Sequence, residues 1–506
     1  MSFEEAVAYL SDPDTHGAGT KVDIVRTHAA IVFLAGDAAY KVKRPVRYDY
    51  LDFSTLEKRQ AMLRRELELN RPNAPGIYLG LVPVTRQADG TLKLGEGGEV
   101  VEWCLHMRRF PAGAELVAVA GRDGISPALA EQIGCEIADY HARAEISRHA
   151  DGRTLVTEIA DELNEAFAGM TDVFGGGLVD RFQTRVRTAI EANAALLSDR
   201  GRAGHVRRGH GDLHLGNMVV LDGRPVLFDA LEFDERLGTL DVLYDLGFVI
   251  MDLLHRGLSE AANAVLGAYL YRARQTGHFN GLALLPLFLG LRAGIRAMVS
   301  VQAARLDDGP GEPEFEGARA YLDHALDYLL PPAPRLVAVG GYSGTGKTTL
   351  SRKLAPDIKP APGAIHLRSD LVRKAMFGVD PLSRLPQSAY SEAAGKRVYA
   401  RLLDQAGRIL QAGHSVILDA VFADADERRE VAELARRADV TFTGLWLQAD
   451  QQTLVSRVSA RRADASDADA AVVRKQIALG DAAENWVRID ARGDLRSVLT
   501  RAIAAL

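Results

Sequence analysis

Two short segments of this 506-residue chain carry residue types whose spacing suits phosphoryl transfer. The first contains His210, Asp212 and Asn217 in the order H-x-D-x-x-x-x-N, and Asp229 follows at the end of an apolar run. Phosphoryl transfer from ATP requires a carboxylate that orients a hydroxyl group, together with an amide and a second carboxylate that hold Mg²⁺. We therefore expect Asp212 to be the catalytic base and Asn217 and Asp229 to be metal ligands.

The second segment is a glycine-rich loop, G-x-x-x-x-G-K-T, between an apolar run and a helical pattern. Its glycines let backbone N–H groups turn inward around phosphate oxygens, and the helix N-terminus adds a favourable dipole. Lys347 would neutralise the outer phosphates, and the Thr348 hydroxyl would suit Mg²⁺. We expect the loop and the residue after it to hold ATP: Gly341, Tyr342, Ser343, Gly344, Thr345, Gly346, Lys347, Thr348 and Thr349.

Two carboxylates follow later apolar runs in the same part of the chain. Asp370 comes after the predicted strand 364–367, and the C-terminal ends of strands face the ligand crevice in an open α/β sheet. Asp370 would orient or deprotonate an acceptor hydroxyl; the alternative is that Ser369 or Asp370 only caps the next helix. Asp419 ends a run in the Walker B arrangement, which predicts a ligand for Mg²⁺ or its water.

Three arginines follow the predicted strand 444–447. A spacing of four residues predicts that Arg457 and Arg461 share a helical face, with Arg462 beside them. Such side chains would close over the phosphates as a lid and stabilise charge in the transition state. The alternative is a solvated basic face.

The secondary-structure elements that must position these residues are predicted to be mainly strands at first and mainly helices later in the chain. Short strands are predicted at 31–34, 39–43, 79–85 and 100–107, and a helix begins at Ser54, the expected N-cap. After Pro111 the pattern is mainly helical. The proline-rich stretch 331–334 predicts a stiff linker. We expect one domain at 1–330 and a second at 335–506.

Residues 20–300 closely resemble the aminoglycoside and choline phosphotransferase family, which shares the protein-kinase fold. The resemblance implies a lysine on an early strand, for which Lys41 fits best and Lys43 is the runner-up. It also implies a helix glutamate that pairs with this lysine, and Glu66 fits better than Glu57. The sequence departs from the kinase pattern because no G-x-G-x-x-G loop precedes Lys41.

About the last 170 residues resemble small P-loop kinases, nearest to the polynucleotide kinase, zeta toxin and gluconate kinase group. The resemblance rests on the P-loop, the Ser-Asp pair after the second strand, the segment VILDAVF and the late arginines. It assigns Lys347 and Thr348 to ATP and Mg²⁺, Asp370 to the acceptor, and Arg457 or Arg461 to a lid.

The two segments together predict an α+β kinase-like domain, with a small β lobe and a larger helical lobe, followed by an α/β P-loop domain with a parallel sheet. The expected protein is an ATP-dependent, Mg²⁺-dependent kinase that transfers phosphate to alcohol groups at two sites. The alternative is that only the P-loop module is active, as a polynucleotide 5′-kinase or toxin-like kinase, while the N-terminal module recruits substrate or regulates.

Charge and composition suggest the partners. Residues 335–506 hold 26 Lys and Arg against 20 Asp and Glu, whereas the rest of the chain has a net charge of −12. We expect a small hydroxyl compound at the N-terminal site, and a nucleotide, sugar acid or polynucleotide end at the C-terminal one. Two cysteines, an N-terminus without basic residues and no apolar run of membrane length predict a cytoplasmic protein without a membrane partner.

Overall fold

The chain folds into two compact units, each of which is built from two separate segments of the sequence. The computed structural model describes residues 2–17, 19–27, 29–48, 51–306, 312–460, 465–478 and 485–506. The first unit comprises Met1–Leu155 and Ser198–Asp252, and the second comprises Val156–Leu197 and Leu253–Leu506. The 331–334 segment lies inside the second unit, so the domain boundaries expected there stay a prediction.

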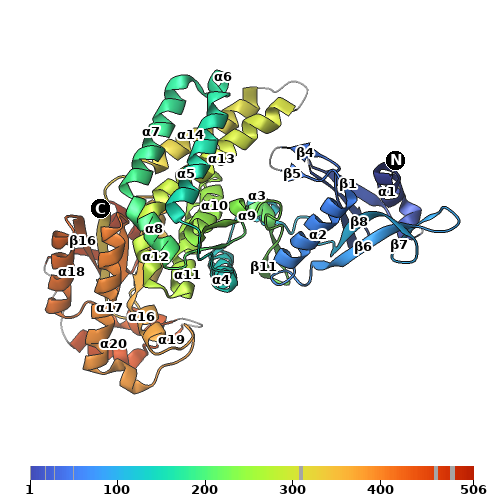
Figure 1. Cartoon of the computed structure of the whole chain (residues 1–506). Helices are drawn as coiled ribbons and strands as arrows, with labels where there is room; N and C mark the ends of the chain where they lie inside the picture. Colours follow the sequence, from blue (N-terminus) through green and yellow to red (C-terminus); the bar gives the residue numbers. More distant parts are fainter. Residues whose placement is uncertain are drawn as a thin grey trace. The chain divides into compact units, whose positions relative to one another are not determined.

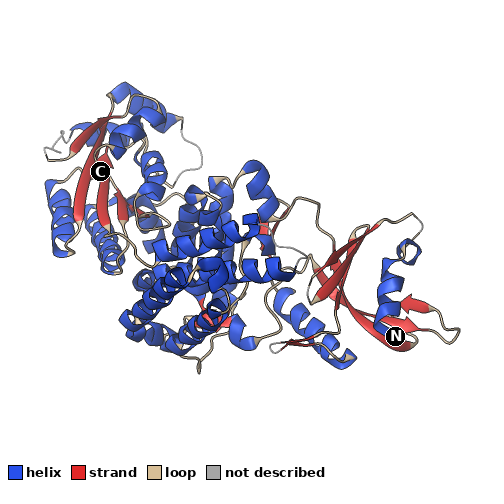
Figure 2. Ribbon diagram, turned by 90° about the horizontal axis from the view of Figure 1, so that it is seen from above, coloured by secondary structure: helices blue, strands red, loops and turns tan. Residues whose placement is uncertain are grey.

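The first unit contains an antiparallel six-stranded sheet, with the order β1-β2-β3-β8-β6-β7 (Figure 2). Its strands are β1 (Val22–Arg26), β2 (Ala30–Ala35), β3 (Ala38–Lys43), β6 (Tyr78–Arg86), β7 (Leu92–Leu94) and β8 (Glu99–Arg108). Strands β2 and β3 are joined by the predicted turn at Gly36, whose φ of 56° suits glycine. In this register Lys41 and Lys43 of β3 lie on one face of the sheet.

Helices and short hairpins complete the first unit. Its helices are α1 (Ser2–Ser11), α2 (Leu56–Asn70), α3 (Leu116–Asp123), α4 (Pro127–Arg143) and α9 (Glu235–Gly238). The hairpins pair β4 (Arg47–Tyr48) with β5 (Leu51–Asp52) and β10 (Met218–Leu221) with β11 (Arg224–Leu227). A third two-stranded pairing joins β9 (Val206–Arg208) to β12 (Thr239–Asp241), which lies farther along the chain. The predicted cap of α2 is wrong by one residue: Thr55, not Ser54, accepts from Lys58 N, because the Ser54 hydroxyl is bonded to Asp52.

Long helices form the first part of the second unit, where α7, α13 and α14 pack together (Figure 1). Its helices are α6 (Thr171–Phe174), α7 (Gly176–Ala192), α11 (Ser259–Ala273), α12 (Thr276–Gly281), α13 (Leu285–Leu306) and α14 (Glu312–Tyr328). Three more helices have one end in each unit: α5 (Gly152–Ala168), α8 (Ala194–Arg202) and α10 (Val242–His255). The β-rich segment followed by a mainly helical one is thus confirmed.

One helical stretch, Thr276–Arg305, is long and apolar enough to cross a membrane by length and composition. The expectation that no segment reaches this length is therefore wrong, because α12 and α13 continue into each other through a 3₁₀ turn, Leu282–Leu284. Within this stretch, 67% of the apolar window is buried inside the structure.

A parallel sheet with the order β14-β15-β13-β16-β17 forms the other part of the second unit (Figure 2). Its strands are β13 (Arg335–Gly341), β14 (Ile365–Arg368), β15 (Val416–Asp419), β16 (Thr441–Gln448) and β17 (Val487–Asp490). Its helices are α15 (Lys347–Leu354), α16 (Ser369–Met376), α17 (Glu392–Gln411), α18 (Ala425–Arg437), α19 (Gln451–Ser459), α20 (Ala470–Ala478) and α21 (Leu495–Ile503).

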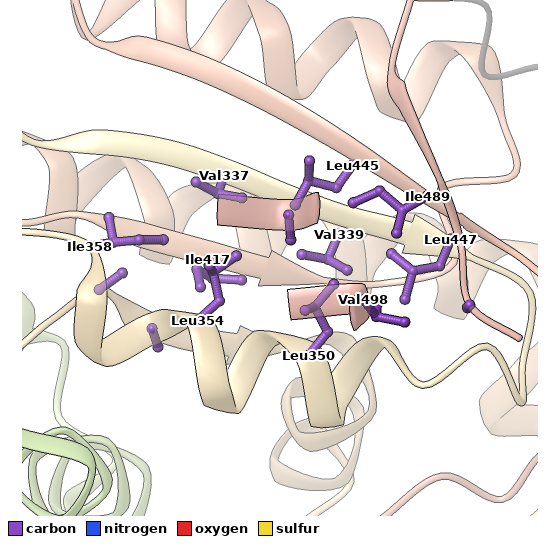
Figure 3. Packing of buried hydrophobic residues seen from close by; sticks show 14 residues of the cluster. Val337, Val339, Leu350, Leu354, Ile358, Ile417, Leu445, Leu447, Ile489 and Val498 are labelled. Atoms are coloured by element: carbon purple, nitrogen blue, oxygen red, sulfur yellow. The ribbon is translucent and has the colours of Figure 1, made fainter. Parts of the chain in front are cut away.

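The core of this sheet fixes the glycine-rich loop. Val337 and Val339 of β13 pack against Leu350 and Leu354 of α15, and all four side chains are at most 1% exposed (Figure 3). A parallel strand buried on both faces must be apolar where it is buried, and β13 is apolar and buried at every position after Arg335. The strand and helix on either side of the loop are thereby locked, so the loop itself is held at both ends.

Candidate functional site

The loop of the first unit that carries the predicted catalytic residue is held from behind by one buried carboxylate. Asp245 of α10 is fully buried and accepts hydrogen bonds from His210 N at 2.7 Å and Gly211 N at 3.1 Å. Nε2 of His141 lies 3.2 Å from the same carboxylate. Because a carboxylate satisfies both backbone N–H groups at once, the loop that leads into Asp212 has a fixed path.

Asp212 and Asn217 lie together on this loop. Asn217 Nδ2 donates to the backbone oxygen and to Oδ2 of Asp212, each at 2.9 Å. Three further hydrogen bonds join the loop to the segment after β11: His210 Nε2 to Phe228 O, Phe228 N to Asn217 O, and Leu231 N to His210 O. The loop with Asp212 and Asn217 is therefore joined directly to the segment that carries Asp229.

Lys41 links the other two predicted residues. Its Nζ lies 2.7 Å from Glu66 Oε1 and 2.7 Å from Asp229 Oδ1. Burial alone would raise the pKa of Asp229, but the Lys41 ammonium reverses this effect and lowers that pKa to about 2. Asp229 has a φ of 60°, an unusual value for aspartate, and its N–H is bonded to the Tyr78 hydroxyl. The structure thus brings together Lys41, Glu66 and Asp229, and Glu66 rather than Glu57 faces the lysine.

Sequence reasoning missed several groups that support this site. Tyr78 positions the Asp229 N–H, Asp252 accepts from Leu215 N at 3.0 Å, and Glu232 pairs with Lys43. An acidic residue in the apolar run of α10 was the one available signal for Asp245, since a buried carboxylate must have donors nearby. Glu232 carried no such signal, because the same short stretch holds three other acidic residues, Asp229, Asp234 and Glu235, and nothing in the sequence singles it out.

Replacing Asp245 with Asn should slow N-terminal transfer by about 10- to 100-fold. The NH₂ group of the new side chain would face a backbone N–H group, lose that hydrogen bond and loosen the loop that carries Asp212. The change should also lower the free energy of unfolding by about 2 kcal/mol. Steady-state kinetics and urea unfolding measure the two effects. Asp241→Asn, at the equally buried Arg200–Asp241 pair, is the matched control and should reduce only stability. An unchanged rate in Asp245→Asn would contradict the positioning role.

The glycine-rich loop of the second unit has the geometry that phosphate binding needs. Gly344 and Gly346 have φ values of 91° and 90°, and a Cβ at Gly344 would lie 2.7 Å from the Leu454 backbone oxygen. Lys347 Nζ donates to Gly341 O at 2.8 Å and Tyr342 O at 3.1 Å. The lysine is therefore turned back over the loop, where the phosphates of a nucleotide would lie.

Asp419 and Thr348 lie side by side, as the Walker pair requires. The Thr348 hydroxyl donates to Asp419 Oδ2 at 2.6 Å. Nε2 of His366 lies 3.3 Å from this oxygen, and Nε of Arg368 lies 3.8 Å from it. Burial alone would raise the pKa of Asp419, but His366 and the neighbouring cations hold it well below the usual range of a carboxyl group. His366 was missed, although its place on β14 next to β15 follows from the strand order.

Asp370 lies inside the first turn of α16, so the capping alternative is wrong. The N-cap position belongs to Arg368, which makes no side-chain cap hydrogen bond, because the helix begins earlier than expected, at Ser369. Burial raises the pKa of Asp370, and the Asp419 carboxylate raises it further. A carboxylate of raised pKa near the P-loop is suited to accept a proton from a hydroxyl group.

Two residues, Asp467 and Gln476, tie the last part of the P-loop domain to this site. Asp467 pairs with the buried Lys374 of α16 at 2.8 Å and accepts from the Tyr390 hydroxyl at 2.5 Å. Gln476 Oε1 of α20 accepts from Ser343 N of the P-loop at 2.8 Å. No local pattern in the sequence marks these residues, because each contact spans at least 77 positions.

The predicted lid arginines are only partly within the described structure. Arg457 of α19 donates from Nη2 to the Ala491 backbone oxygen at 2.9 Å. Helix α19 ends at Ser459, and Arg461 and Arg462 lie outside the described residues. A lid role for Arg457 and Arg461 therefore stays a prediction.

Both sites have donors that fit Mg²⁺. Within the described ranges, no three His, Cys, Asp or Glu side chains form a metal cluster. Mg²⁺ needs no such cluster, since one or two carboxylates, substrate phosphates and water complete its shell. Asp229 with Asn217, and Asp419 with Thr348, supply oxygen ligands of this kind.

Two family models match separate parts of this chain. Residues 82–279 match the family model described as a phosphotransferase enzyme family, and residues 336–481 match the model described as an AAA domain. Among solved structures, a choline/ethanolamine kinase family protein from Mesorhizobium loti is 16% identical, covering 65% of this chain and 98% of its own, with a TM-score of 0.39. A gluconokinase from Sinorhizobium meliloti is 18% identical, covering 34% and 91%, with a TM-score of 0.26.

Two curated relatives extend over nearly the whole chain. The uncharacterized protein Rv2004c of Mycobacterium tuberculosis is 30% identical over 484 residues, which cover 93% of each chain. The uncharacterized protein Mb2027c of Mycobacterium bovis gives the same values. The chain is an ATP-dependent phosphotransferase with a kinase-like α+β domain and a P-loop domain, and it belongs to the family of these mycobacterial proteins.

Proposed function

We propose that both modules are active and that each transfers the γ-phosphate of ATP to a hydroxyl group of a different acceptor. One observation supports this proposal: each unit holds a lysine together with a carboxylate placed as expected for a phosphate and Mg²⁺ site. Lys41 is joined to Glu66 and Asp229 in the first unit, and in the second Thr348 is joined to Asp419 beside the P-loop. A module that serves only to recruit substrate or to regulate would not need both a phosphate-binding lysine and a carboxylate for Mg²⁺.

In the N-terminal module, Asp212 orients the acceptor hydroxyl and accepts its proton. Lys41, fixed by Glu66, contacts the phosphates of ATP, while Asn217 and Asp229 hold Mg²⁺, which neutralises charge on the phosphates. Asp212 and Asn217 are hydrogen-bonded to each other, so the base and one metal ligand keep a constant separation.

In the C-terminal module, the backbone N–H groups of the loop and Lys347 bind the ATP phosphates. Thr348 and Asp419 provide the place for Mg²⁺, and Asp370 takes the proton of the acceptor. Arg457 and Arg461 are the candidates for stabilising charge in the transition state.

The acceptors we propose differ in charge. Residues 229–245 add acidic side chains beside the N-terminal site, which favours a cationic or neutral small hydroxyl compound. The excess of basic residues in 335–506 favours an anionic acceptor, such as a nucleotide, a sugar acid or a polynucleotide end. We also propose a cytoplasmic location, where ATP is available.

A transfer screen with the full-length protein tests this function. Radiolabelled γ-phosphate is offered with aminoglycosides, small polyols, sugar acids and 5′-hydroxyl oligonucleotides, to wild type, Asp212→Ala and Lys347→Ala. Each acceptor should lose its label in one variant and keep it in the other. If every transfer survives in Asp212→Ala and vanishes in Lys347→Ala, only the P-loop module is an enzyme. Labelling of oligonucleotides alone would then identify a polynucleotide kinase.

The acid limb of the C-terminal pH–rate profile should lie above the range of an ordinary aspartate. Asp370 must be deprotonated to accept a proton, and burial next to Asp419 raises its pKa, so activity is lost earlier as the pH falls. Arg368 opposes this shift, so Arg368→Gln should move the limb to still higher pH. The profile of kcat/KM measures the effect. The exposed Arg437→Gln is the control, and a limb that does not move in Arg368→Gln would contradict the assignment.

A further inference from the structure

A buried network of charges joins strand β3, helix α2 and the segment after β11. Lys41 Nζ lies 2.7 Å from both Glu66 Oε1 and Asp229 Oδ1. Lys43 Nζ lies 2.7 Å from Glu66 Oε2 and 2.5 Å from Glu232 Oε1. Positive and negative groups alternate from Asp229 through Lys41, Glu66 and Lys43 to Glu232. The side chains of Lys43, Glu66 and Glu232 are at most 8% exposed, so water screens their interactions little.

This arrangement attaches one short loop to one strand at two points. Asp229 and Glu232 are three residues apart on the loop, while Lys41 and Lys43 are two residues apart on β3 and therefore face the same side. Glu66 gives one carboxylate oxygen to each lysine and fixes the distance between them. The backbone of Asp229, at a φ of 60°, needs such outside support.

The two attachment points have different tasks in the proposed N-terminal reaction, on which this inference rests. Lys41 and Asp229 must turn to the phosphates and to Mg²⁺ when ATP binds, which weakens their mutual contact. Lys43 and Glu232 are not among the residues assigned to the nucleotide, so nothing in the proposed reaction requires their pair to open. We propose that the Lys43–Glu232 ion pair is a positioning pair, which keeps the Asp229 loop against β3 while Lys41 and Asp229 engage ATP.

Removing one partner of such a pair should change the rate more than the binding of ATP. An unpaired charge in a buried site is costly, so the loop would shift to relieve it. A shift of about 1 Å at a reacting group can slow catalysis about 100-fold. Lys41 and Glu66 remain paired when only Glu232 is changed, so the contacts to the phosphates are kept.

The test uses the full-length chain with Lys347→Ala, so that ATP turnover belongs to the N-terminal module. Slow hydrolysis of ATP with Mg²⁺ is measured, so no acceptor is needed. Adding Glu232→Gln should lower the hydrolysis rate at saturating ATP by about 30-fold and change the KM for ATP by less than about threefold. Hydrogen exchange of residues 229–232 should become faster.

Glu102→Gln is the matched control. Arg59 and Glu102 form an equally buried ion pair, 2.7 Å long, between α2 and β8 of the same sheet. This change should lower the melting temperature while the rate, measured well below that temperature, stays within about twofold of the parent. A rate in Glu232→Gln that falls no further than in Glu102→Gln would overturn the proposal.

A double-mutant cycle shows whether Lys43 and Glu232 act through their ion pair or independently of each other. If Lys43 and Glu232 act together, Lys43→Met with Glu232→Gln should be no slower than Lys43→Met alone. Multiplying losses would mean separate roles and would overturn the pair. If the parent hydrolyses ATP no faster than the same chain with Asp229→Ala, the proposed N-terminal activity fails. In that case hydrogen exchange alone tests the proposal. Unchanged exchange of residues 229–232 in Glu232→Gln would refute the idea that the Lys43–Glu232 pair holds the Asp229 loop against β3.

Discussion

Asp212→Asn should abolish transfer to the N-terminal acceptor, with a loss in kcat of about 10²- to 10⁴-fold, and leave the affinity for ATP nearly unchanged. The carboxylate is the group that takes the acceptor proton, and an amide cannot do so. Its oxygen can still accept the hydrogen bond from Asn217 Nδ2, now 2.9 Å long, so the loop keeps its shape. The measurements are transfer kinetics with the acceptor found in the screen, and ATP titration by calorimetry.

Asp229→Ala is the companion variant for this experiment. It removes a proposed Mg²⁺ ligand, which is also one of the two carboxylates that pair with Lys41, so ATP affinity in the presence of Mg²⁺ should fall along with the rate. Both variants should melt cooperatively, which excludes loss of fold. If ATP affinity collapsed in Asp212→Asn but survived in Asp229→Ala, the two roles would have been exchanged.

Lys347→Ala should remove the activity of the C-terminal module, lowering its kcat by at least about 100-fold, and leave N-terminal transfer intact. The ammonium group lies over the loop, 2.8 Å from Gly341 O, and no other described residue of the loop carries a positive charge. Backbone N–H groups alone cannot balance the charge that the leaving phosphates develop. Transfer to each acceptor, measured separately in one preparation, reports both modules.

Lys353→Ala is the matched control for this change. Lys353 lies about 1.7 turns further along α15, and its exposed ammonium pairs with Glu260. It should leave both activities near wild type, since exposed ion pairs contribute little. Undiminished C-terminal turnover in Lys347→Ala would refute the nucleotide site in the P-loop.

The sequence by itself predicted those site residues that lie close together along the chain. Asp212 and Asn217 are five positions apart on one loop, and the P-loop fits within nine consecutive residues, so local chain geometry suffices to bring their groups together. Strands β2, β3, β6 and β8 were also predictable, because each is a short stretch rich in apolar residues that is bounded by turn-forming residues. The expected cap at Ser54 failed by one residue, because Ser54 and Thr55 are chemically equivalent caps and only the competing bond to Asp52 separates them.

Only the tertiary structure decided which distant charges meet. Glu57 and Glu66 lie on the same helix, and the rotation of α2 against β3 alone turns Glu66 to Lys41. Asp245 supports a loop 34 positions earlier, and Glu232 reaches a lysine 189 positions away, which no periodicity encodes. Periodicity records which face of an element is buried, but not which partner covers it. The pairing of buried charges depends on how separate elements pack, and that information exists only once the chain has folded.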